Sequence, residues 1–224
     1  SRGWSTLKLY FMIGQPGETM EDVQAIADLS KKVIVEGRKA IGKRANLHVG
    51  VSTFVPKPHT PFQWSSLDPL LTVLEKQNLL KDQLRGPGMK MTWSNPRETI
   101  LEAALSRGDR NLAKVIETAW RNGAKFDAWQ DQFNYNVWMD AFDTQGISPD
   151  FYATRKREID EVFPWDHIHT GVTRKYLQRE YDRSQKEELT DDCRDGCHAC
   201  GILSGFSDPC QAHPGQLWLC PEVN

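Results

Sequence analysis

The stretch that decides the fold is LKLYFMIGQPGET, residues 7–19. Its first seven residues form a mostly apolar run, which is typical of a buried strand. The turn at residues 14–17 follows at once, and Thr19 then stands at the N-cap position of a helix with an acidic first turn. The stretch therefore predicts a strand, a tight turn and a helix without a gap, with the helix ending near Gly37.

A second strand is predicted over residues 47–55, where apolar and polar side chains alternate. A strand, a helix of this length and another strand predict a right-handed parallel crossover, which is the repeating unit of barrels and doubly wound sheets. A further helix is expected over 68–85, with Asp68 as its N-cap, and a short strand over 89–93. The fold class is therefore α/β in this part of the chain.

The pattern becomes helical from Pro96 onward. Apolar spacing and glycine punctuation predict helices over 97–106, 110–121, 135–144, 155–162 and 173–188. The region from 120 to 165 is dense in aromatic side chains, most of which are expected to pack in the core.

Composition and charge exclude several classes of protein. The 224 residues are 39% hydrophobic and 26% charged, with a formal net charge of −2, so no basic excess indicates nucleic-acid binding. No apolar stretch approaches the about 20 residues that a membrane-spanning helix needs. A soluble, cytoplasmic protein is expected. The chain starts at Ser1 rather than Met, so we expect it to begin in the middle of a longer protein.

All five cysteines lie between Cys193 and Cys220. Such clustering predicts a local metal site rather than a disulfide framework. Cys193, Cys197 and Cys200, with Cys210 or less readily Cys220 as a fourth thiolate, suit zinc or an iron–sulfur cluster. His198 or His213 could replace a thiolate. The alternative is a set of reduced thiols in a tail without a ligand.

Two motifs, YFMIGQPGETMED at 10–22 and FVPKPHTPF at 54–62, resemble radical S-adenosylmethionine (radical SAM) enzymes. The first is similar to the strand end of that family with its acidic helix start, and the second to a late loop of its barrel. The stretches 58–64, 126–129 and 164–168 are similar to one uncharacterised bacterial subfamily, whose members resemble cobalamin-binding radical SAM proteins.

The resemblance implies a three-part organisation. Residues 1–93 would be the C-terminal part of a radical SAM (βα) barrel, 94–189 a helical region and 190–224 a Cys-rich metal-binding tail. The intact protein would bind S-adenosylmethionine and a 4Fe-4S cluster, and a missing N-terminal part would supply the cluster motif and a cobalamin domain. The fold class expected for this chain is thus an α/β partial (βα) barrel fragment, followed by helices and the tail.

The resemblance also implies cofactor-binding residues at the carboxyl end of the barrel strands. These are Gly14, Pro16, Gly17 and Glu18, with Lys57, His59 and Thr60 at the same mouth. Glu18 has a simpler role open to it, as a first-turn carboxylate favoured by the helix dipole. Lys57 and His59 could likewise be ordinary loop residues.

Cys193, Cys197 and Cys200 have the spacing of the family's catalytic triplet, but they lie far after the late-barrel motif. Their position predicts an auxiliary site, so this chain alone should not cleave S-adenosylmethionine. The first functional hypothesis is a fragment of a radical SAM enzyme. The alternative is a non-catalytic zinc or iron–sulfur interaction module. A contact with RNA is a weaker hypothesis, since related methylthiotransferases modify RNA but no basic excess supports it here.

Overall fold

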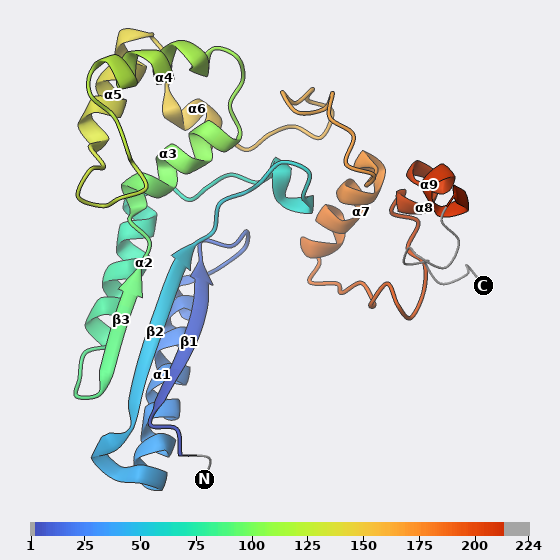
Figure 1. The fold of residues 1–224 in the computed structure, drawn as a ribbon. Helices are drawn as coiled ribbons and strands as arrows, with labels where there is room; N and C mark the ends of the chain where they lie inside the picture. Colours follow the sequence, from blue (N-terminus) through green and yellow to red (C-terminus); the bar gives the residue numbers. More distant parts are fainter. Residues whose placement is uncertain (1–2, 213–224) are drawn as a thin grey trace. The chain divides into compact units, whose positions relative to one another are not determined.

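Figure 1 shows the computed structural model of the chain, which describes residues 3–212 apart from the side chains of Pro209 and Cys210. The chain divides into two compact units. The first contains the residues up to Val55 together with Ser66–Arg155. The second contains Pro56–Ser65 together with the residues from Lys156 onward. Each unit therefore draws on two separate parts of the sequence.

The first unit is built on three parallel strands in the order β1-β2-β3. They are β1 (Thr6–Ile13), β2 (Asn46–Thr53) and β3 (Met89–Trp93), and all three strands predicted from the sequence are confirmed. The register pairs Leu7 with Leu47 and Leu47 with Met89. β2 is thus the central strand, and β1 and β3 form the two edges.

Two helices, α1 (Met20–Ile41) and α2 (Leu70–Gln83), cover one face of this sheet (Figure 1). Because side chains alternate between the faces of a strand, the apolar odd-numbered residues of all three strands point to these helices. The resulting core contains Ile13, Val23, Ala27, Ile34, Leu47, Val49, Val51 and Leu80, with Leu9, Phe11, Met89 and Met91 packed against it. The even-numbered residues of the strands point to the other face.

The expectation of a partial (βα) barrel is wrong. The sheet is open and three-stranded, and within residues 3–212 no barrel closes. The strand, helix and strand pattern is common to barrels and open sheets, so it fixes the parallel pairing but not the closure. Closure depends on strand number and on a shear between strands that single segments do not encode.

The end of α1 and the start of α2 differ from the positions predicted from the sequence. α1 has the predicted N-cap, since the Thr19 hydroxyl accepts a hydrogen bond from the Asp22 amide and the Asp22 carboxylate accepts one from the Thr19 amide. It runs past Gly37 to Ile41, and Gly42, with a φ of 64°, is the C-cap. A Cβ at Gly37 would lie 3.3 Å from the Ala45 side chain, so glycine there allows close packing. Asp68 does not cap α2, which starts at Leu70. The Asp68 carboxylate has another partner, described below.

Four helices complete the first unit and pack on one another. They are α3 (Pro96–Ser106), α4 (Leu112–Arg121), α5 (Tyr135–Thr144) and α6 (Pro149–Ala153). Their core includes Leu101, Val115, Trp138, Phe142 and Tyr152. The predicted helices near 97–106, 110–121 and 135–144 are confirmed.

The second unit has a small aromatic core around Trp64, which is fully buried. Trp64 is the last residue of the short 3-10 helix η2 (Pro61–Trp64), which packs against α7 (Arg174–Ser184). Its ring centroid lies 6.0 Å from that of Phe163 and 5.7 Å from that of Tyr181. Two short helices follow, α8 (Ile202–Gly205) and α9 (Ser207–Ala212).

The helix predicted over 155–162 is absent from the structure. A backbone group of this segment instead makes a contact within the second unit: the Arg157 amide donates to the Trp64 carbonyl at 3.0 Å. The Trp165 indole further along donates to the Gln63 side chain at 2.9 Å. The segment therefore binds the loop Pro56–Ser65 without forming a helix.

Candidate functional site

The loop between β1 and α1 is folded on itself at the carboxyl end of the sheet. The Gly14 amide donates a hydrogen bond of 2.7 Å to the Glu18 carboxylate, and the Glu18 amide donates one of 3.0 Å to the Gln15 carbonyl. Gly14 has a positive φ of 83°, and a Cβ there would lie 3.3 Å from an Asp68 carboxylate oxygen. Glycine at this position therefore permits both the turn and the close approach of Asp68.

A buried cation, Lys76, links this loop to α2. Its Nζ lies 2.8 Å from Glu18 Oε2 and 2.7 Å from Asp68 Oδ2. The exposed fractions of the Lys76, Glu18 and Asp68 side chains are 5%, 8% and 27%. Burial by itself would lower the pKa of Lys76, but its hydrogen bonds with Asp68 and Glu18 outweigh burial, and the net pKa is raised. The Glu18 carboxylate is thus paired with Lys76 inside the fold.

Sequence reasoning missed Lys76. The signal for it was its position on α2, because Val73, Lys76, Gln77 and Leu80 form a stripe at helical spacing that is buried. A lysine on a buried stripe requires an acidic partner. The two carboxylates that meet it are Glu18, one of the predicted cofactor contacts, and Asp68, the predicted cap of α2.

The predicted cofactor residues fall into two groups. Gly14, Pro16, Gly17 and Glu18 lie in the first unit, whereas Lys57, His59 and Thr60 belong to the loop of the second unit. Within that loop, the Thr60 hydroxyl donates to the Lys57 carbonyl at 2.8 Å, and the His59 amide donates to the Gln63 side chain at 3.2 Å. The His59 imidazole Nε2 is buried without a hydrogen-bond partner in the described part of the chain.

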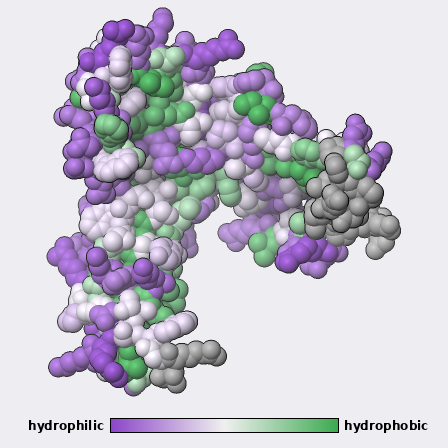
Figure 2. Space-filling model, viewed as in Figure 1, coloured by the Kyte–Doolittle hydropathy of each residue, from purple (hydrophilic) through white to green (hydrophobic). Residues whose placement is uncertain are grey.

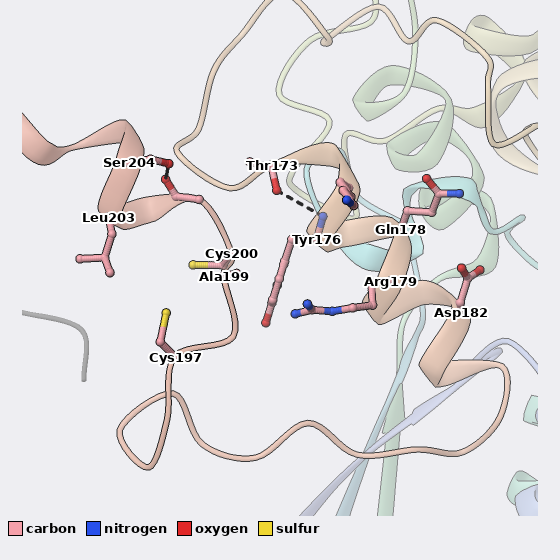
Figure 3. Close-up of a pocket in the computed structure, with 12 residues that line it drawn as sticks. Thr173, Tyr176, Gln178, Arg179, Asp182, Cys197, Ala199, Cys200, Leu203 and Ser204 are labelled. Atoms are coloured by element: carbon pink, nitrogen blue, oxygen red, sulfur yellow. Dashed lines mark hydrogen bonds between the residues drawn. The ribbon is translucent and has the colours of Figure 1, made fainter. Parts of the chain in front are cut away.

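The cysteine segment borders a cavity of about 880 Å³ in the second unit. Figure 3 shows Tyr176 and Arg179 projecting from α7 toward the segment that carries Cys197 and Cys200, whose sulfur atoms point to the same side. Two hydrogen bonds hold this segment on α7. The Thr173 amide donates to the Cys200 carbonyl at 2.8 Å, and the Arg179 guanidinium donates to the His198 carbonyl at 2.5 Å.

Close backbone packing fixes where the cysteine segment ends. Gly201 has a φ of 108°, and a Cβ there would lie 2.6 Å from the Thr173 side chain and 2.9 Å from the Gly171 carbonyl. No other residue fits without displacing backbone. The thiols of Cys197 and Cys200 are therefore presented from a segment that is anchored directly after them.

The cavity has an unusual electrostatic environment at Tyr176. Burial raises the pKa of its phenol, and the neighbouring Glu180 carboxylate and Cys200 thiol raise it further, whereas Arg179 acts in the opposite direction. The Arg179 guanidinium carbon lies 4.9 Å from the Tyr176 ring centroid, which is a cation–π contact. The phenol is therefore held neutral and can act as a hydrogen-bond donor at the edge of the cavity.

The predicted metal ligands are brought together only in part. Cys197 and Cys200 line the cavity, whereas Cys193 is exposed and does not. Among the residues that the structure describes, no three His, Cys, Asp or Glu side chains are placed to hold a metal ion. The Cys210 side chain, Cys220 and His213 lie outside the described residues.

Comparison with known proteins finds a similar archaeal protein. An uncharacterised protein of Methanocaldococcus jannaschii is 35% identical over 115 residues, which are 51% of this chain and 24% of that protein. The chain thus spans about a quarter of the length of the relative it matches. No known family profile matches the chain, and no solved structure matches it.

No helix within the described residues is long and apolar enough to cross a membrane.

Proposed function

We propose that the second unit binds a metal centre, either zinc or an iron–sulfur cluster, through Cys193, Cys197, Cys200 and Cys210. The observation that carries this proposal is the pair of thiols, Cys197 and Cys200, that border one cavity from an anchored segment. The donor chemistry is suitable, because both zinc and iron–sulfur clusters are held by thiolates at such spacings. A cytoplasmic location is part of the proposal, since thiols stay reduced there.

Metal binding requires the segment before Cys197 to move. Cys193 is exposed and does not border the cavity, so it has to be drawn toward the other two thiols. Gly196 adjoins Cys197, and a Cβ there would meet no atom of the described residues within 4 Å, so the backbone has room to turn at this point. The cost of closing so short a loop is small.

The experiment is elemental analysis and visible absorption of protein purified anaerobically without chelators. We expect about one zinc ion per chain without colour, or iron with brown charge-transfer bands. Cys197→Ser should abolish the metal, whereas Cys220→Ser, the matched control, should leave it in place. Protein that is metal-free under these reducing conditions, or equal metal loss in both variants, would contradict the proposal.

A second candidate function is a contribution to a radical SAM enzyme in a longer protein. It rests on the resemblance of the motifs at 10–22 and 54–62, and one observation favours it. The Thr53 hydroxyl, at the carboxyl end of β2 beside Gly14, is buried without a hydrogen-bond partner among the described residues. Ligands of parallel α/β sheets bind at this end of the strands. A preceding part of the protein would then supply the catalytic 4Fe-4S cluster, the remaining S-adenosylmethionine contacts and any cobalamin domain.

For this second candidate we expect no S-adenosylmethionine cleavage by the chain alone. Anaerobic incubation with dithionite and S-adenosylmethionine should give no 5′-deoxyadenosine above background, because the tail thiols belong to an auxiliary site. Product that depends on reconstituted iron and disappears in Cys197→Ser would show instead that the tail triplet is catalytic. Addition of the preceding part of the protein should restore cleavage, and its failure to do so would remove the second candidate.

A further inference from the structure

The face of the sheet opposite α1 and α2 carries a row of basic side chains. The register pairs Lys8 with His48 and His48 with Lys90, so the three residues lie side by side across the three strands. All three occupy even-numbered positions, which point away from the two helices. Figure 2 shows a mixture of hydrophilic, neutral and hydrophobic residues on the side of the strands that faces the viewer, rather than a continuous apolar surface.

This row carries two lysine charges that the described fold leaves uncompensated. Neighbouring strands lie about 4.8 Å apart, so the backbones of Lys8 and Lys90 are about 10 Å apart on either side of His48. None of Lys8, His48 and Lys90 forms an ion pair or a side-chain hydrogen bond with a described residue. The even-numbered positions of the three strands contain no Asp or Glu that could compensate the charge. A local violation of this kind is expected where a site serves a ligand rather than the fold.

The neighbouring row of residues forms a hollow together with the basic row. It pairs Tyr10 with Gly50 and Gly50 with Thr92. A Cβ at Gly50 would lie 3.0 Å from the Tyr10 ring, so the absence of a side chain there lets the ring lean over the centre of the sheet. Lys8, Tyr10, His48, Gly50, Lys90 and Thr92 line a depression of about 170 Å³.

We propose that this depression binds a phosphate-type oxyanion through Lys8, His48 and Lys90. The lining suits that ligand: two lysines, a histidine and the hydroxyl-bearing Tyr10 and Thr92 border one small space, and charge-assisted hydrogen bonds to phosphate are strong. The volume is below the about 300 Å³ at which sites for whole drug-sized ligands begin. It fits a single phosphate group, either free or carried by a nucleotide whose remainder extends beyond the hollow.

The experiment is a titration of the 224-residue chain with inorganic phosphate, followed by the amide resonances of the three strands at constant ionic strength. We expect saturable shifts centred on Lys8, His48 and Lys90, with a dissociation constant on the order of 1 mM. Lys8→Gln and Lys90→Gln should each weaken binding about tenfold, since each removes a charge-assisted hydrogen bond. Lys43→Gln, an exposed lysine outside the row, is the matched control.

The same titration with ADP distinguishes the two sources of the ligand. Tighter binding of ADP identifies a nucleotide phosphate, and equal binding identifies free phosphate. Shifts that stay linear with phosphate, or that weaken equally in Lys43→Gln, would mean general ionic screening and would overturn the proposal. Binding of a single-stranded oligonucleotide without binding of phosphate would overturn it too.

Discussion

Replacing Lys76 with Met should lower the free energy of unfolding of the first unit by about 3–5 kcal/mol, because it leaves two carboxylates without their buried cation. Glu18 is only 8% exposed, so its charge cannot be solvated when Lys76 is removed. The measurement is hydrogen exchange of the amides of α2 and of the loop at 14–18, which reports on this unit alone.

The matched control is Lys39→Met. Lys39 forms an ion pair of 2.7 Å with Glu36, but its side chain is 68% exposed. Exposed pairs contribute little, so this variant should change stability by less than about 0.5 kcal/mol. Combining Glu18→Gln with Lys76→Met should also cost less than the sum of the single changes, since it removes one of the two uncompensated charges. Equal protection in Lys76→Met and Lys39→Met would show that the network does not hold the loop.

The ion pairs of Lys76 make the stability of the first unit depend on pH in the alkaline range. The pKa of Lys76 in the folded state is raised above its ordinary value of 10.5. The stabilisation is therefore fully present below that ordinary value and is lost as the pH rises through the higher folded-state value. The difference in stability between the natural protein and Lys76→Met should accordingly shrink only above about pH 10.5.

Replacing Trp64 with Ala should destabilise the second unit by about 3–5 kcal/mol, the usual cost of removing a fully buried aromatic side chain. Trp64 lies at the centre of a small core, in contact with Phe163 and Tyr181, and the Arg174 guanidinium carbon lies 5.7 Å from its ring centroid. The loss should release Pro56–Ser65 and α7 together. Limited proteolysis with mass spectrometry should then find new cleavage sites between residues 156 and 184.

Trp129→Ala serves as the control for Trp64→Ala. It makes the same chemical change at a side chain that is 61% exposed. Its main ring contact is with Phe126, at 6.5 Å between centroids, and Phe126 is itself exposed. The digestion pattern should therefore match that of the unmodified chain. If Trp64→Ala resists proteolysis as well as Trp129→Ala does, the aromatic core is not what holds the second unit together.

The local elements of this fold were predictable from the sequence, because each depends on neighbouring residues. The strand at 6–13, the Thr19 cap and the helix at 135–144 follow from apolar spacing and capping chemistry. Long-range features were not predictable. Whether the sheet closes depends on strand number, and the partners of Lys76 come from residues 8 and 58 positions earlier in the chain.

In the aromatic region from 120 to 165, the burial of single residues was likewise not predictable from the sequence. Trp138, Phe142 and Trp165 are buried as expected, but Trp120, Phe126, Trp129 and Phe151 are exposed. Aromatic density predicts a core, yet it does not say which ring of a helix faces inward. For the candidate site, the sequence identified the thiols of Cys197 and Cys200, but it did not predict that Tyr176 and Arg179 of α7 would join them at one cavity.

The loop Pro56–Ser65 has a consequence for the order of folding. Gln63 and its partner Trp165 are 102 residues apart in sequence, so the loop leaves the ribosome long before the residues that bury it. At a synthesis rate of about 5–20 residues per second, it must wait about 5–20 s for them. During that interval the apolar side chains of Phe62 and Trp64 have no core of their own to enter. Contacts of such long sequence separation form slowly, so the second unit should fold later than the first unit and depend more on chaperones.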